Sequence, residues 1–298
     1  MTLARTLLAA TDFSAPAHRA LERAAQLAEV HPGARLTLAH VTSRSVLDNL
    51  RRLLSRDAAA IEVHLLEQAE RALAVLAKEL AARHPCAIDT VLKQGPAPAA
   101  LVELAEERHS DLMVMGARGA HFVHEHLLGS TTERVLRTTR RPLLAVKQRP
   151  HAPYRRILAP VDFSDHAAAA INAAHAWLPD ADFVLLHAFE SELESTFQLA
   201  GLSDSQIDEY RIQARVSAQA AMETFVDKLQ VPKDRLSRQF VHGAASRLIL
   251  EHEQSIDADL IVMGKHGLSV MEELLLGSVT QHVLAYSSSD VLVAGHPI

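Results

Sequence analysis

Glycine and hydroxyl residues recur at one spacing in two distant stretches of this sequence. The first stretch is MGARGAHFVHEHLLGST at residues 115–131, and the second is MGKHGLSVMEELLLGSVT at residues 263–280. Both follow an apolar run, and both read Gly-x2-Gly-x9-Gly-Ser before an amphipathic segment. Glycines allow a backbone to approach phosphate oxygens closely, while N–H groups in a turn and at a helix N-terminus attract anions. The spacing therefore indicates a phosphate-binding loop in each stretch.

Glycine also occurs in ordinary turns between strands and helices, which is the simpler interpretation of any one of these residues. Six glycines that match in two stretches favour the binding loop. Two better-known phosphate-binding patterns are missing, because no Gly-x4-Gly-Lys-Ser/Thr follows an apolar run and no Gly-x-Gly-x-x-Gly follows the first one. The loop is therefore of a different kind from those two.

The two stretches belong to two copies of one longer unit. Three pairs of segments match at nearly constant separation: ATDFS at 10–14 with PVDFS at 160–164, LTLAHV at 36–41 with FVLLHA at 183–188, and SDLMVMG at 110–116 with ADLIVMG at 258–264. The copies meet in KQRPHAPYRR at 147–156, where prolines and arginines interrupt the periodic pattern. The repeat predicts one domain at 1–149 and a second at 150–298.

Short apolar runs alternate with longer amphipathic segments in each copy. In the first copy, strands are expected at 5–10, 35–41, 87–93, 111–116 and 142–147, and helices at 15–30, 46–83, 98–108 and 129–139. Apolar runs without alternation are typical of parallel strands covered by helices on both faces. The pattern predicts an α/β fold of two tandem doubly wound parallel-sheet domains. Ligands in such sheets bind beyond the carboxyl ends of the strands.

An aspartate follows the first strand of each copy, within Asp-Phe-Ser. Asp12 and Asp162 are placed where a carboxylate reaches a ligand at the end of a strand. Each also lies two residues before a serine, Ser14 or Ser164, that is expected to cap the next helix. Ligand binding and capping are equally good interpretations of these aspartates.

Glycine loops after the fourth strand and Asp-Phe-Ser after the first resemble the universal stress protein family, and two copies resemble its tandem members. The resemblance covers nearly the whole chain and implies Rossmann-like, adenine nucleotide alpha hydrolase-like domains. In ATP-binding members, the aspartate, the residues after strand two and the glycine loop surround ATP, often with a divalent metal such as Mg²⁺ or Mn²⁺. The ATP-binding residues implied in the first copy are Asp12, Val41, Gly116, Gly119, Gly129, Ser130 and Thr131. Those implied in the second are Asp162, Ala188, Gly264, Gly267, Gly277, Ser278 and Val279.

Each copy departs slightly from the family's ATP-binding pattern. The first has Ala10 where proline is common and Thr131 where valine is common, and the second has Ala188 where valine is common. Neither copy lacks a glycine of this pattern, so both sites are expected to bind ATP. Arg118 and Lys265 are the cations within the two Gly-x2-Gly segments.

Histidines and the cysteine provide little support for other chemistry. His121, His124 and His126 lie within the first glycine loop, but their spacing matches no standard zinc motif and they have no counterparts in the second. His40 and His187 lie near the end of the second strand of each copy and are expected to be structural or close to the ligand. Cys86 is the single cysteine, which favours a reducing compartment and hence the cytoplasm.

Charge and hydropathy limit the partners. The net charge of −6 argues against nucleic-acid binding, and no apolar run is long enough to span a membrane. Residues 1–149 contain 20 Lys and Arg against 16 Asp and Glu, whereas residues 150–298 contain 10 against 20. Each copy ends in an apolar edge strand, at 142–147 and 290–295, and single-copy relatives dimerise through this strand. The two copies are therefore expected to form an intramolecular pseudo-dimer, and homodimerisation through the long second helices stays open.

The sequence favours a cytoplasmic, ATP-binding stress or regulatory protein whose protein partner it does not identify. A slow ATPase is the first alternative, but it needs a general base, and Asp12, Asp162 and scattered histidines are the candidates. A nucleotide-free interaction module is the second alternative, which the intact glycine loops disfavour.

Overall fold

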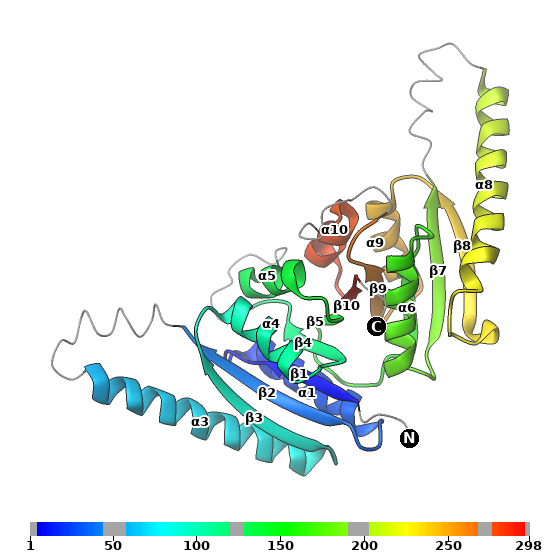
Figure 1. Cartoon of the computed structure of the whole chain (residues 1–298). Helices are drawn as coiled ribbons and strands as arrows, with labels where there is room; N and C mark the ends of the chain where they lie inside the picture. Colours follow the sequence, from blue (N-terminus) through cyan, green and yellow to red (C-terminus); the bar gives the residue numbers. More distant parts are fainter. Residues whose placement is uncertain (1–4, 44–57, 120–127, 190–202, 268–275, 296–298) are drawn as a thin grey trace. The chain divides into compact units, whose positions relative to one another are not determined.

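The chain divides into two compact units, Met1–Pro153 and Tyr154–Ile298, each built on a parallel β-sheet (Figure 1). The computed structural model describes residues 5–43, 58–119, 128–189, 203–267 and 276–295. Two tandem doubly wound α/β domains are therefore present, as predicted. The boundary after residue 149 stays a prediction.

The first unit has the strand order β3-β2-β1-β4-β5, with every neighbouring pair parallel. Its elements are β1 (Thr6–Ala10), α1 (Ala15–Glu29), β2 (Arg35–Thr42), α3 (Ala58–Arg83), β3 (Ala87–Gln94), α4 (Ala97–Glu107), β4 (Leu112–Gly116), α5 (Ser130–Thr138) and β5 (Leu143–Val146). The chain moves from β1 toward β3 and then returns to the other side of β1 for β4. The gap between β1 and β4 is the switch point at which such sheets bind ligands.

The second unit repeats this order as β8-β7-β6-β9-β10. Its elements are β6 (Arg156–Pro160), α6 (Asp165–Trp177), β7 (Asp182–Phe189), α8 (Asp204–Val226), the 3₁₀ turn η1 (Lys233–Arg235), β8 (Leu236–His242), α9 (Ala245–Ser255), β9 (Leu260–Gly264), α10 (Ser278–Tyr286) and β10 (Asp290–Ala294). The switch point lies between β6 and β9, which pair in parallel.

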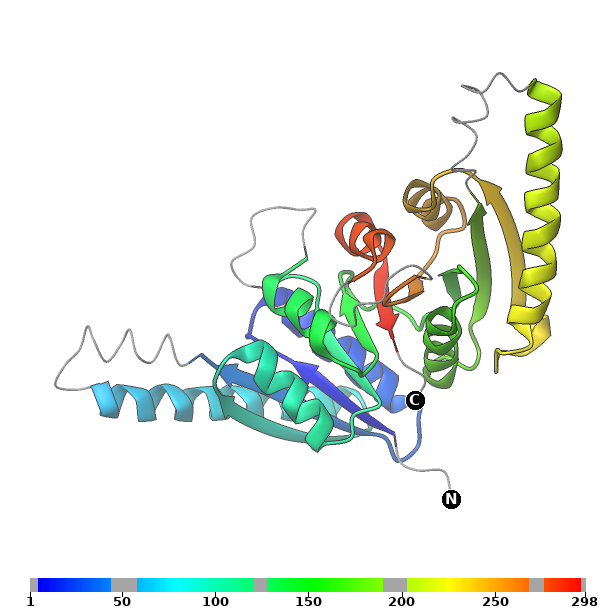
Figure 2. The ribbon, with the colours of Figure 1, turned by 45° about the horizontal axis from the view of Figure 1, so that its top comes forward.

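Helices cover both faces of each sheet, which explains the uninterrupted apolar strands. In the first unit, α1 packs on β1 and β4, α3 packs on β2 and β3, and α4 packs on α5. Figure 2 shows α3 running beside β2 and β3. The central strand β4 is buried along its whole length, with Leu112, Met113 and Val114 fully inaccessible to solvent.

The long helices α3 and α8 bury one face and expose apolar residues on another. On α3, Leu73 and Leu80 are buried, whereas Val75 is exposed. On α8, Phe225 is buried, whereas Ile212 is exposed. Core packing therefore explains one face of each helix. The described part of the helix expected at 46–83 begins at Ala58, and its first residues lie outside the described ranges.

A buried histidine joins the end of α3 to α1. His84 donates from Nδ1 to Glu29 at 2.7 Å and from Nε2 to Glu22 at 2.9 Å, and Arg83 forms an ion pair with Glu22 at 2.7 Å. Burial alone lowers the pKa of His84, but the hydrogen bonds to Glu29 and Glu22 and their negative charges together raise it above 6.5. The doubly protonated imidazolium is therefore the form that the folded chain stabilises.

This histidine predicts a pH-dependent stability of the first unit. Because the folded pKa lies above the unfolded value, the stabilisation is complete below about pH 6.5 and is lost as the pH rises through the folded pKa. His84→Gln is expected to lower the free energy of unfolding by about 1.5–3 kcal/mol at low pH and by less at high pH. Urea unfolding at several pH values measures this difference. His64→Gln, on an exposed position of α3, is the control, and an equal pH dependence in both variants would contradict the assignment.

Candidate functional site

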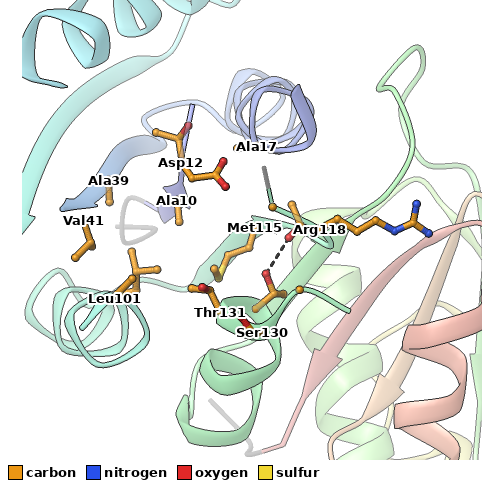
Figure 3. A pocket seen from close by; sticks show the side chains of 16 residues that line it. Ala10, Asp12, Ala17, Ala39, Val41, Leu101, Met115, Arg118, Ser130 and Thr131 are labelled. Carbon is orange, nitrogen blue, oxygen red and sulfur yellow. Dashed lines mark hydrogen bonds between the residues drawn. The ribbon is translucent and has the colours of Figure 1, made fainter. Parts of the chain in front are cut away.

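A cavity of about 240 Å³ opens at the carboxyl ends of β1, β2 and β4 in the first unit (Figure 3). All seven residues that the sequence assigned to the first site line it: Asp12, Val41, Gly116, Gly119, Gly129, Ser130 and Thr131. Val41, Leu101 and Met115 give one side of the cavity an apolar surface. The glycines and Asp12 form a polar side.

The second unit has an equivalent cavity of about 220 Å³. Its lining includes all seven residues assigned to the second site: Asp162, Ala188, Gly264, Gly267, Gly277, Ser278 and Val279. Ile249 and Met263 line this cavity as Leu101 and Met115 line the first. His187 and His266 also line the second cavity.

The helices that begin at the two cavities are not capped by a side chain. Gly129 and Gly277 are the N-cap residues of α5 and α10, and neither N-cap makes a side-chain hydrogen bond. Ser130 and Ser278 are the first helical residues and therefore do not occupy the N-cap position. A glycine has no side chain that could accept hydrogen bonds from the first N–H groups of a helix, and such N–H groups attract anions.

By contrast, serine caps the helices that follow the first strands. Ser14 accepts a hydrogen bond from the Ala17 N–H at 3.3 Å, and Ser164 accepts one from the Ala167 N–H at 3.2 Å. The same local rule, a hydroxyl at the N-cap, is thus obeyed at α1 and α6 and absent at α5 and α10. At α5 and α10 the N-cap is a glycine in both copies, so its side chain offers no acceptor to the first N–H groups of the helix.

Each aspartate after the first strand supports its own turn with one oxygen and faces the glycine loop with the other. Asp12 Oδ1 accepts from the Ser14 N–H at 3.0 Å, and Asp162 Oδ1 accepts from the Ser164 N–H at 3.1 Å. A Cβ at Gly119 would lie 3.0 Å from Asp12 Oδ2. The two interpretations of Asp12 are therefore compatible, since the turn occupies Oδ1 and Oδ2 lies at the loop.

A strained phenylalanine completes this turn in both copies. Phe13 has φ 64° and Phe163 has φ 65°, which is the left-handed region that bulky residues rarely adopt. Their rings lie against His40 at 4.5 Å and His187 at 4.3 Å, measured between ring centroids. Each histidine donates from Nδ1 to the carbonyl two residues before that phenylalanine, at 2.8 Å. These histidines hold the turn in place, and His187 also borders its cavity.

The first glycine of each loop is required by packing as well as by the cavity. A Cβ at Gly116 would lie 3.0 Å from the Arg118 carbonyl oxygen and 3.1 Å from the Pro16 backbone. A Cβ at Gly264 would lie 3.1 Å from the Ala167 nitrogen. None of the six loop glycines has a positive φ. At Gly116 and Gly264, therefore, the lack of space for a Cβ requires glycine, and the backbone conformation does not.

Two threonines that the sequence did not single out fix the loops to the strands. The Thr132 hydroxyl donates to the Gly116 carbonyl at 2.8 Å, and the Thr280 hydroxyl donates to the Gly264 carbonyl at 3.0 Å. Both threonines are buried and line their cavities. Both threonines stand three residues after the last glycine of their loop, and this repeated position is the sequence signal that could have identified them.

Arg118 and Lys265, the cations of the two Gly-x2-Gly segments, are placed differently in the two copies. In Figure 3, the Arg118 guanidinium extends away from the first cavity. Lys265 is buried, and its Cβ lies 3.0 Å from where a Cβ on Gly295 would be, so its aliphatic part packs at the end of β10.

His121, His124 and His126 lie outside the described residues, so the structure does not test metal binding by these loop histidines. Within the described ranges, no group of three or more His, Cys, Asp or Glu side chains is arranged to hold a metal ion. Nor does any described helix have the length and apolar character needed to cross a membrane.

Comparison with known proteins agrees with two copies of one domain in this chain. A universal stress protein of Methanocaldococcus jannaschii is 31% identical over 153 residues, which is 47% of this chain and 94% of that protein. A universal stress protein of Bacillus subtilis is 28% identical over 145 residues, covering 47% of this chain and 98% of that protein. Each relative thus corresponds to about one half of this chain.

A solved structure resembles the chain over both halves. The crystal structure of a universal stress protein from Archaeoglobus fulgidus matches 97% of this chain and 98% of its own, with a TM-score of 0.68 and 21% identity, which supports the fold. The sequence pattern of the universal stress protein family matches residues 4–147 and again residues 153–295. The chain therefore belongs to the universal stress protein family, as a tandem member with two Rossmann-like, adenine nucleotide alpha hydrolase-like domains.

Proposed function

We propose that each copy binds ATP in its glycine-loop cavity and that the chain acts as a cytoplasmic stress-response or regulatory protein. The observation that carries the proposal is the glycine N-cap of α5 and α10, opposite the Gly-x2-Gly turn, in both copies. Uncapped N–H groups at a switch point favour a polyphosphate. The proposal assigns the triphosphate to this side.

The opposite side of each cavity suits a purine base. Val41, Leu101 and Met115 in the first copy, and Ile249 and Met263 in the second, provide apolar contact area for a flat ring. The cavities of about 240 and 220 Å³ are of similar size, so the proposal covers both. Cytoplasmic location is part of this proposal and is supported by family membership and the single cysteine.

A divalent metal fits these sites as a companion of the nucleotide. Asp12 is the carboxylate that lines the first cavity, and Asp162 is the one that lines the second. Mg²⁺ or Mn²⁺ is bound by one or two carboxylates together with phosphate oxygens, so one aspartate per site matches this mode. Bound there, the metal would neutralise phosphate charge. The chain's own part is to present the aspartate carboxylate, whose Oδ1 also supports the turn.

Mass spectrometry of small molecules released from freshly purified, denatured protein tests the proposal directly. We expect ATP or another adenine nucleotide, at up to two molecules per chain. Protein that releases none, and that shows no heat on titration with ATP and Mg²⁺, would exclude the proposal. If a different nucleotide were released, the proposed ligand would be that nucleotide instead of ATP.

Slow hydrolysis is the expected behaviour of a bound ATP. Phosphoryl transfer to water needs an oriented water and a base as well as bound phosphates. Asp12 and Asp162 are restrained by their turns and placed to coordinate a metal, while His187 and His266 line the second cavity and keep a weak ATPase as the alternative. We expect turnover well below about 1 s⁻¹ in a steady-state assay. Faster turnover that is lost in Asp12→Asn/Asp162→Asn, with binding retained, would favour the enzyme.

The assembly predictions stay proposals. We propose that the copies pair through the apolar strands at 142–147 and 290–295 as a pseudo-dimer, with homodimerisation as a further step. The opposite net charges of the two halves support this pairing, and salt is expected to weaken it. Binding of nucleic acid is not expected. The protein partner is left open.

A further inference from the structure

A basic surface depression lies in the first unit, separate in its lining from the two cavities. It has a volume of about 610 Å³ and is formed by the turn before α1, by α1 itself, by the end of α3 and by the segment after β5. Its ionisable lining residues are His18, Arg19, Glu22, Arg83 and Arg149. The lining thus contains three guanidinium groups and a single carboxylate.

The arginines keep donors for a ligand after their own contacts are counted. Arg19 donates one N–H to the Lys147 carbonyl at 3.2 Å, and Arg83 pairs with Glu22 at 2.7 Å and donates from Nε to the Glu79 carbonyl at 3.4 Å. A guanidinium has five N–H donors, so each contact leaves others. The exposed Arg149 side chain forms no ion pair with any residue in the described part of the chain. Glu22 also accepts a hydrogen bond from His84, through its other carboxylate oxygen.

The first helix of the second unit lacks the charged residues that α1 contributes to this depression. Aligning the two Asp-Phe-Ser turns places Ala168, Ala169 and Asn172 at the positions of His18, Arg19 and Glu22. The basic groups are therefore not a requirement of the fold, which forms without them in the second copy. They also contribute to the positive balance of residues 1–149.

We propose that this depression binds a small inorganic anion with two phosphate groups, of the pyrophosphate class. The planar guanidinium pairs in a bidentate manner with phosphate oxygens, and several such forks in one place match an anion with several charged oxygens. These charged residues line a single depression of about 610 Å³, which suits a small anion rather than a nucleic-acid strand. The proposal does not depend on nucleotide binding in the glycine-loop cavities.

Calorimetric titration of the full chain with inorganic pyrophosphate at low salt tests the site. Arg83→Gln/Arg149→Gln is expected to weaken binding about tenfold or more, because at least one charge-assisted contact is lost. Lys228→Gln/Lys233→Gln removes the same charge from surface pairs with Asp165 and Asp227 and is expected to leave the affinity unchanged. Arg149→Gln alone disturbs no described ion pair, so it gives a weaker but folded test if the double variant does not fold.

Three results would overturn the proposal. The first is an unmodified chain that does not bind pyrophosphate. The second is equal weakening in the arginine and lysine variants, which would indicate diffuse electrostatic attraction. The third is loss of binding in Gly129→Val/Gly277→Val with retention in the arginine variant, because the glycine loops would then be the site. The first two results do not bear on the proposed ATP sites. The third would support anion binding by the glycine loops of the two cavities.

Discussion

Titration with ATP and Mg²⁺ is expected to give no measurable binding for the variant carrying Gly129→Val and Gly277→Val, a loss of at least about a hundredfold in affinity. A Cβ at Gly129 would lie 3.3 Å from the Ala117 carbonyl oxygen and 3.4 Å from the Arg118 Cα. The valine methyl groups extend further, so they would displace the Gly-x2-Gly turn or fill the space beside the helix N-terminus. Either change removes N–H groups from the phosphate position.

The single variants make this result quantitative. Gly129→Val is expected to leave one binding site per chain in the second copy, and Gly277→Val to leave one in the first. The stoichiometry therefore falls from two to one in each single variant. A Cβ at Gly277 meets its nearest atoms at 3.7 Å, an ordinary contact, so this variant is expected to fold. Unchanged binding in a double variant whose circular dichroism matches the parent would refute the proposed site.

Gly116→Ala and Gly264→Ala are expected to destabilise their units by about 1–3 kcal/mol each, because the added Cβ overlaps backbone that does not move freely. At Gly116 the obstructing atoms belong to Arg118 and Pro16, at 3.0 and 3.1 Å. At Gly264 they belong to the first turn of α6, at 3.1 Å. The strand and the helix would have to separate to accommodate the methyl group.

Urea unfolding compares these variants with Gly277→Ala. The control also replaces a loop glycine, but its Cβ has room, so we expect it to cost less than about 1 kcal/mol, from the poorer N-cap. If Gly277→Ala lost as much stability as Gly264→Ala, the short contact of the added Cβ at Gly264 would not be the reason that glycine is required there. ATP binding per folded molecule separates this packing effect from an effect on the ligand.

Several features of the site were accessible from the sequence because they arise locally. Ser14 and Ser164 cap α1 and α6 as predicted, since an N-cap depends on residues within one helical turn. The apolar runs that end in Gly116 and Gly264 are central strands, since a run without alternation is buried on both faces. Duplication made these signals stronger, because each was present twice.

The sequence by itself determined the order of strands and helices, the two copies and the residues that gather at each cavity, because parallel strands bring the loops after them to one edge. Only the tertiary structure decided how the residues divide their roles. Gly116 packs against Pro16 and Gly264 against the turn of Ala167, about a hundred residues away along the chain. Arg118 points away from its cavity, and His84 joins α3 to Glu22 and Glu29 on α1. Such contacts depend on the distance between elements remote in sequence, which local periodicity does not contain.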